Sequence, residues 1–235
     1  MILYERIKIW ALKCRRCFLN QSIISICALA ALLSAVPAKA DSFSMLFGYT
    51  ESVQTNIEAF PQWVALMDSS RNHQAFETAA WLQFLADVSE LTPTVQLDAV
   101  NKFINRHNYV GDQKNYGHQD HWATPEELQN NGGDCEDFAI SKLFALLHLG
   151  WSPESLRLVV VQDTQLKLPH AVLAVATEDK VWILDNQSRI IKPEQAIDHY
   201  VPIYSISGMQ WWLHTPQGLN MAAVSLNSAK APASK

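Results

Sequence analysis

Cysteine is scarce in this sequence, and it is unevenly distributed. Only four of the 235 residues are cysteines, and three of them, Cys14, Cys17 and Cys27, fall near the start of the chain. Cys14 and Cys17 form a CxxC pair, but their basic surroundings do not indicate a zinc or redox site. The rest of the chain holds one cysteine, Cys135, which excludes an internal disulfide there. A lone thiol in an oxidising compartment is a liability unless it is buried or used, so Cys135 is the first candidate functional residue.

Long apolar runs are also scarce, and the clearest one lies near the start of the chain. It covers residues 23–36, follows the basic residues Arg6, Lys8, Lys13, Arg15 and Arg16, and precedes Ala38-Lys39-Ala40. This order predicts a secretory signal peptide over residues 1–40, cleaved before Asp41. The alternative is an uncleaved membrane anchor, but the run is shorter than the roughly 20 residues that span a bilayer.

Basic residues are few, which argues against binding to nucleic acid. The chain has 18 Lys and Arg against 23 Asp and Glu, for a net charge of −5. Six of the basic residues and one acidic residue lie in residues 1–40, so cleavage would move the net charge to −10. Such an acidic protein has no electrostatic footprint for nucleic acid. The remaining length suits one domain, which we place at residues 41–216, followed by a flexible tail at residues 217–235 that is rich in Ala, Ser and Lys.

The apolar pattern changes from helical to strand-like along the chain. We expect helices after Pro61, from Asn72 or His73, after Thr92, from Thr124 and from Cys135. Residues 105–123 have the composition of a loop. Strands are expected over residues 156–161, 170–176 and 181–184, with further strand material at 203–206 and 211–213. Helices first and strands later indicate an α+β fold.

Cys135 stands where a helix is expected to begin. The turn Gly132-Gly133 precedes it and an apolar helical pattern follows it. The N–H groups and partial positive charge of a helix N-terminus favour a thiolate, which is a nucleophile. The alternative is a small buried hydrophobic residue, as most free cysteines are. The acidic neighbours Asp134 and Glu136 would be unfavourable in an apolar core and argue against that alternative.

A predicted hairpin brings His170 close to Asp185. Residues 177–180 read as the turn between the two strands. If this loop has an even number of residues, positions 170 and 185 face the same side of the sheet, paired directly or diagonally. A carboxylate placed there can hold the tautomer of an imidazole while the other ring nitrogen faces a nucleophile. Taken alone, each residue has an ordinary explanation, His170 as a strand-start residue and Asp185 as a turn residue.

Three segments carry a resemblance to a known family: GGDCED at 132–137, LPHAVL at 168–173 and WILDN at 182–186. Together with HWATPE at 121–126, they resemble the bacterial transglutaminase-like cysteine proteinases over most of residues 81–212. The resemblance implies a papain-like, transglutaminase-like fold with N-terminal helices and a nucleophile helix packed on an antiparallel sheet. It also implies that Cys135 is the nucleophile, His170 the general base and Asp185 the residue that orients His170.

The resemblance further implies dependence on calcium. Asp134 and Glu136 offer the hard oxygen ligands that Ca²⁺ prefers, next to the proposed nucleophile. Asp120, or Asp112, in the preceding loop is a candidate for a further ligand. The sequence around Cys135 is not an EF-hand. The alternative is that Asp134 only caps the helix and Glu136 only favours its dipole.

Location and partners are also implied by the resemblance alone. It implies a periplasmic protease that cuts the N-terminal region of a large outer-membrane adhesin, which releases the adhesin and disperses a biofilm. It implies an inner-membrane cyclic-di-GMP receptor as the inhibitor. Two other functions remain open at this stage. One is a transglutaminase or deamidase with the same triad, and the other is an exported binding module that has lost catalysis.

Overall fold

The computed structural model describes residues 43, 45–71 and 78–218. The predicted signal peptide and nearly all of the predicted tail lie outside these residues, so both stay predictions. Among the described residues, no helix is long and apolar enough to cross a membrane.

The helices occupy mainly the first part of the described chain. They are η1 (Ile57–Ala59), α2 (Pro61–Arg71), α3 (Ala79–Val88), α4 (Pro93–Ile104), α5 (Asp112–Asn115), α6 (Pro125–Asn131), α7 (Cys135–His148), η2 (Pro153–Ser155) and η3 (Glu194–Ala196). The predicted helices after Pro61, Thr92 and Thr124 and at Cys135 are confirmed. At Thr124, the hydroxyl accepts the Glu127 N–H and the Glu127 carboxylate accepts the Thr124 N–H, which is the predicted capping box.

One expected helix differs from the prediction in its described part. The expected helix from Asn72 or His73 does not run through residue 78, because Thr78 is extended (φ −71°, ψ 152°). Its hydroxyl accepts the Trp81 N–H at 3.2 Å and caps α3, which therefore begins at Ala79. The predicted start itself lies outside the described residues.

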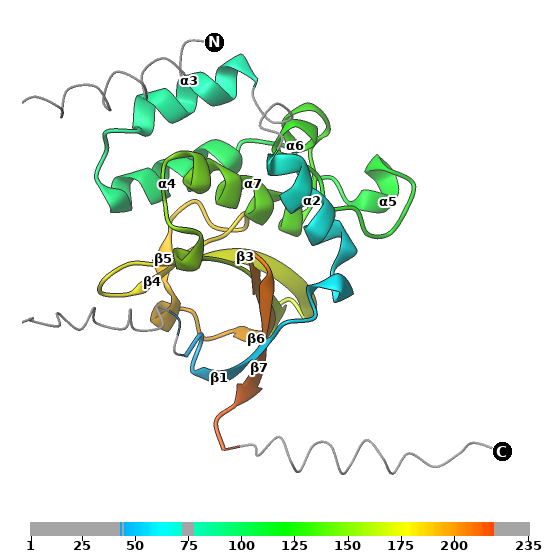
Figure 1. Cartoon of the computed structure of the whole chain (residues 1–235), viewed down its shortest axis with the longest axis vertical. Coiled ribbons are helices and arrows are strands. Elements are labelled where there is room, and N and C mark those ends of the chain that lie inside the picture. Colours follow the sequence, from blue (N-terminus) through cyan, green and yellow to red (C-terminus); the bar gives the residue numbers. More distant parts are fainter. Residues whose placement is uncertain (1–42, 44, 72–77, 219–235) are drawn as a thin grey trace, which may run out of the picture. The chain divides into compact units, whose positions relative to one another are not determined.

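The strands form one antiparallel sheet in the order β1-β7-β6-β2-β3-β4-β5. They are β1 (Tyr49–Gln54), β2 (Leu156–Asp163), β3 (Leu168–Ala176), β4 (Val181–Leu184), β5 (Lys192–Pro193), β6 (Tyr200–Ser207) and β7 (Gln210–Pro216). Figure 1 shows α4 and α7 over one face of this sheet, and α7 packs on β3 and β2. The predicted α+β fold is confirmed.

The central strands of the sheet are buried on both faces, as the apolar run at 156–161 predicts. Leu156 and Leu158 of β2 join the core beneath the helices. Val159 and Val161, which point the other way, join a second apolar cluster. Phe43 and Leu46, just before β1, close that second cluster from outside. Strands β2 and β3 are covered on both faces and are therefore held rigidly, and β3 carries His170.

The turn before α7 is held against the preceding loop by backbone contacts. The Val110 N–H donates to the Gly133 carbonyl at 2.8 Å, and the Gly133 N–H donates to the Asn108 carbonyl at 3.2 Å. Gly132 adopts φ +77°, and a Cβ placed there would lie 2.5 Å from the Asn108 carbonyl oxygen. Only glycine therefore fits this position without displacing the backbone that leads into α7.

We expect Gly132→Ala to destabilise the protein by roughly 2 kcal/mol or more, because φ strain and a backbone clash add together. Gly48→Ala is the matched control, since Gly48 also has φ +77° but a Cβ there meets no atom within 4 Å. Strain alone should cost about 1 kcal/mol at that position. Urea unfolding of both variants measures the difference, and equal losses would show that the contact with Asn108 is unimportant.

Candidate functional site

Cys135 is the first residue of α7, and a buried carboxylate organises the backbone around it. Asp137 is fully buried; its Oδ2 accepts the Asp134 N–H at 3.0 Å and its Oδ1 accepts the Ala123 N–H at 2.6 Å. One side chain thus ties the end of the 105–123 loop to the start of α7. No role was predicted for Asp137. An acidic residue three positions after an N-cap was the available signal.

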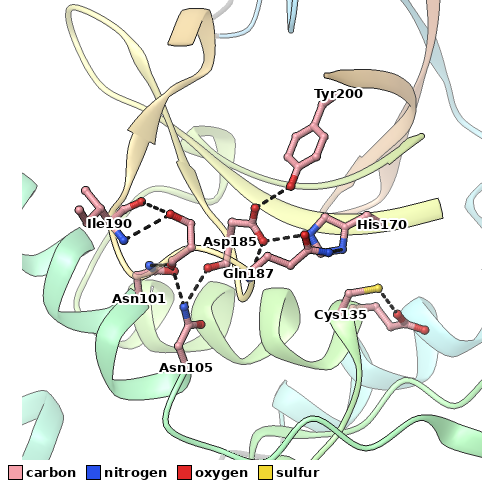
Figure 2. A network of polar contacts seen from close by, with 10 residues as sticks. Asn101, Asn105, Cys135, His170, Asp185, Gln187, Ile190 and Tyr200 are labelled. Carbon is pink, nitrogen blue, oxygen red and sulfur yellow. Dashed lines mark hydrogen bonds and ion pairs between the residues drawn. The ribbon is translucent and has the colours of Figure 1, made fainter. Parts of the chain in front are cut away.

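The hairpin prediction is confirmed. Ala176 pairs with Val181 across a loop of residues 177–180, so the loop is even and positions 170 and 185 face the same side, offset diagonally. His170 Nε2 lies 2.9 Å from Asp185 Oδ1, with both side chains buried (Figure 2). A proton on Nε2 completes this hydrogen bond and leaves Nδ1 with its lone pair. Nδ1 has Gln187 Nε2 as a neighbour at 3.4 Å, which suits that tautomer.

Asp185 is held by donors on both carboxylate oxygens. Besides His170, the Gln187 N–H donates to Oδ1 at 2.9 Å and the Tyr200 hydroxyl donates to Oδ2 at 2.7 Å. Burial raises the pKa of Asp185, but the hydrogen bond and charge of His170, aided by the other two donors, outweigh it and lower the pKa below its usual value. Burial, and after it the charge of Asp185, raises the pKa of Tyr200, so Tyr200 stays a donor. Neither Gln187 nor Tyr200 was predicted as part of the site. Tyr200 lies on β6, a strand whose pairing the sequence does not reveal.

Cys135 lies beside His170 in Figure 2. Its thiol donates to Glu136 Oε2 at 3.1 Å, and the N–H of Ala171, next to His170, acts on the same sulfur as a hydrogen-bond donor. Burial raises the pKa of the thiol well above its usual range, and the charge of Glu136 raises it further. The expectation that the helix terminus would favour a thiolate is therefore wrong for this arrangement, because burial, and after it the adjacent carboxylates, outweigh the effect of the terminus.

Carboxylates crowd around the start of α7. Oxygen atoms of Asp112, Asp120 and Glu136 lie within 4.8 Å of one another, and so do those of Asp112, Asp134 and Asp137. Asp112 Oδ1 and Asp134 Oδ1 are buried and have no hydrogen-bond partner among the described residues. Burial, together with Glu136 and Asp112, raises the pKa of Asp134 to about 8. An all-oxygen set with unused buried acceptors fits a hard divalent cation such as Ca²⁺.

The structure places each predicted metal candidate in one or more of several overlapping clusters. Asp134, Glu136 and Asp120 are in the clusters, and Asp112, named beside Asp120 as a candidate, is common to two of them. Asp112 is almost fully buried, whereas Asp120 is exposed and also accepts hydrogen bonds from Gln62 at 2.7 Å and Trp122 at 3.2 Å. Asp134 is also the N-cap of α7, as the alternative predicts, and this role leaves its buried Oδ1 without a partner among the described residues.

A profile of one protein family matches residues 78–218, and that family is described as bacterial transglutaminase-like cysteine proteinase, BTLCP. The matched range includes Cys135, His170 and Asp185. No curated protein matches the chain.

Solved structures of LapG from Legionella pneumophila are similar to this chain. The calcium-bound form is 26% identical with a TM-score of 0.53, and the match covers 71% of this chain and 99% of that chain. The EGTA-treated form is 28% identical with a TM-score of 0.53, and the match covers 72% of this chain and 90% of that chain. The chain therefore belongs to the family of bacterial transglutaminase-like cysteine proteinases, and it is a cysteine protease of the LapG type.

Proposed function

We propose that this protein is a calcium-dependent cysteine endopeptidase in which Cys135 is the nucleophile, His170 the general base and Asp185 the residue that orients His170. The observation that carries the proposal is the buried 2.9 Å contact between His170 Nε2 and Asp185 Oδ1, next to the helix start that bears the thiol. A nucleophile, a base and an acid that fixes the base are the three parts that acyl transfer by a thiol requires.

The proposed reaction follows from the tautomer of His170. Nδ1 takes the proton of the Cys135 thiol, and the sulfur attacks a peptide carbonyl carbon. The negative charge that forms on the carbonyl oxygen is stabilised by the Cys135 backbone N–H at the N-terminus of α7. His170 then protonates the departing amine, which leaves an acyl-enzyme. Water, deprotonated by the same nitrogen, releases the acid and restores the thiol. Throughout, Asp185 stabilises the positively charged imidazole.

The carboxylates at the start of α7 would hold the calcium ion. Asp112, Asp134 and Glu136 are the core of the proposed set, and the exposed Asp120 completes it on the solvent side. When bound, the ion supplies positive charge where carboxylates otherwise raise the pKa of the thiol. The calcium-bound and EGTA-treated forms of the Legionella protein support this assignment by analogy.

The proposed substrate is the periplasmic N-terminal region of a large outer-membrane adhesin, cut at a small-residue site of the Ala-Ala type. Its release would disperse a biofilm, and an inner-membrane cyclic-di-GMP receptor would inhibit the protease. The support is the match of the whole motif set and the predicted signal peptide, which would place the enzyme in the periplasm. We infer these partners from the family resemblance.

We expect Cys135→Ala to abolish cleavage of a purified N-terminal adhesin fragment. Asp185→Asn should lower kcat by roughly 10²–10⁴-fold with little change in KM, because the amide stabilises the wrong tautomer of His170. Gel-based and continuous cleavage assays in calcium measure both. Asp98→Asn, on the surface of α4, is the control and should cleave as the native protein does.

The same assay distinguishes the other activities. An adhesin fragment that stays intact with native protein in calcium would refute the adhesin substrate. Incorporation of a fluorescent amine into a glutamine substrate, without peptide cleavage, would establish a transglutaminase instead. If neither reaction is observed with any protein substrate, the remaining function is that of an exported binding module.

We expect EGTA to abolish cleavage and calcium to restore it. Calcium at about 100 times its Kd should also stabilise the fold by about 2.7 kcal/mol, because it binds the folded state. Asp112→Asn and Asp134→Asn should weaken calcium binding in titration calorimetry and reduce this thermal shift. The Asp98→Asn variant should keep both. Cleavage that persists in EGTA would keep the protease and refute its calcium dependence.

A further inference from the structure

A tight turn just before β1 holds a phenylalanine in an unusual backbone conformation. The Tyr49 N–H donates to the Leu46 carbonyl at 3.0 Å across this turn. Its two central residues, Phe47 and Gly48, have φ +51° and +77°. Positive φ at both central positions is the type I′ arrangement, which favours Asn followed by Gly. Phenylalanine is unfavourable at the first position, because a bulky side chain rarely adopts positive φ.

Two long-range contacts hold Phe47 in this conformation. Its N–H donates at 2.6 Å to Glu194 Oε2, and Glu194 is buried in η3, the short helix before β6. Its ring meets the ring of Tyr200, the first residue of β6, edge to face, with centroids 6.0 Å apart and an angle of 79° between the planes. This is a favourable geometry for an aromatic pair. Phe47 thus contacts both ends of the segment that leads into β6.

Tyr200 contacts both members of the dyad. Its hydroxyl donates to Asp185 Oδ2 at 2.7 Å (Figure 2), and its ring centroid lies 5.7 Å from that of His170. Tyr200 is 5% exposed, so its neighbours enclose its ring. The Phe47 ring covers one part of that surface, and the His199 ring, with its centroid at 4.5 Å, covers another. Phe47, Tyr200 and Asp185 therefore form a continuous line of contacts that ends at the general base.

The alternative is that Phe47 only covers the second apolar cluster, against which its side chain packs. A turn with that purpose alone would favour Asn or Gly at this position, since Phe43 and Leu46 from the same segment already fill the cluster. Phe47 is only half-buried, so its burial stabilises the fold less than that of a core residue. The strain occurs where the residue meets the support of Asp185, and such strain is concentrated at functional sites.

We propose that Phe47 is a positioning residue, which holds the Tyr200 hydroxyl on Asp185 and thereby fixes Asp185 beside His170. The inference rests on the proposed protease function and deepens it. The Phe47 ring limits both the movement and the hydration of the Tyr200 ring. Without it, water competes with the hydroxyl for the carboxylate, and the hydrogen bond that orients Asp185 is weakened. Phe47 thus acts on the general base through two other side chains.

The first test is Phe47→Asn in the mature chain with saturating calcium. Asn-Gly is the pair that a type I′ turn favours, so this variant keeps the turn and removes the ring. With adhesin fragment, we expect kcat to fall roughly ten-fold with no change in KM, because small displacements of a catalytic group are costly. The rate at which iodoacetamide alkylates Cys135 at neutral pH reports the thiolate without any substrate, and it should fall by a similar factor.

A double-mutant cycle with Tyr200→Phe, which keeps the ring and removes the hydroxyl, separates a positioning role from a structural one. If Phe47 acts through that hydroxyl, Phe47→Asn should have little further effect on kcat or on alkylation in the Tyr200→Phe background. A role in packing alone does not depend on the hydroxyl, so the two losses would then multiply. That multiplication would overturn the proposal.

The matched control is Val181→Ala. Val181 is buried in the same apolar cluster, but it lies at the start of β4, four residues and roughly 13 Å before Asp185. Its melting temperature should fall, whereas its kcat and alkylation rate should match those of the native protein. A ten-fold loss in this control would show that any damage to the cluster slows the reaction, and would refute a specific role for Phe47. If the native protein is alkylated normally but cuts no adhesin, the protease function fails while the Phe47 test still stands.

A second variant, Phe47→Leu, covers the case in which Phe47→Asn does not fold. Leucine keeps an apolar side chain against the cluster and lacks only the aromatic ring. The alkylation rate should fall roughly three-fold, the fold-change that corresponds to the loss of one aromatic pair. This fall should again be absent in the Tyr200→Phe background. An alkylation rate equal to that of the native protein would refute the proposal.

Discussion

Repulsion among carboxylates at one helix start is the constraint on which this site depends. Asp134, Glu136 and Asp137 follow one another around Cys135, and Asp112 comes close from the preceding loop. The negative charges of these carboxylates are stabilised in different ways. Asp137 receives two backbone N–H groups and fixes the chain, whereas Asp134 keeps an unused oxygen. Protons or a bound cation must stabilise the remaining carboxylate charge. The reactivity of the Cys135 thiol is therefore sensitive to what binds to these carboxylate oxygens.

The surroundings of Asp185 have the opposite effect on the pKa of a carboxyl group. Asp185 is also buried, yet its pKa lies below the usual value, because His170, Gln187 and Tyr200 all donate to it. Burial, together with the neighbouring Glu136 and Asp112, raises the pKa of Asp134 to about 8, although the Asp112 backbone N–H opposes this shift. Environments that separate the pKa values of neighbouring acids commonly divide their roles in enzymes. The carboxylates at the start of α7 therefore suit a cation, and Asp185 suits the imidazolium form of His170.

Local sequence signals predicted much of this arrangement and failed where pairing is long-range. The four-residue loop at 177–180 fixed the parity of His170 and Asp185, and the capping box at Thr124 fixed α6. Strand β1, however, pairs with β7 from the far end of the described chain, and its short sequence has no clear alternation. Tyr200 reaches Asp185 only because β6 lies beside β2. No local pattern encodes that neighbour.

Helix α7 connects these parts mechanically as well as electrically. Its buried residues run from Asp137 to Leu146, so the helix cannot shift on β3 without opening the core. Cys135 projects from the end of this rigid element, where loop and helix meet, and His170 projects from a strand covered on both faces. The distance between sulfur and imidazole is thus set by core packing, while the charge around the sulfur is set by Glu136 in the first turn of α7 and by Asp134 just before it. A change in ligand at the loop can then alter reactivity without moving the dyad.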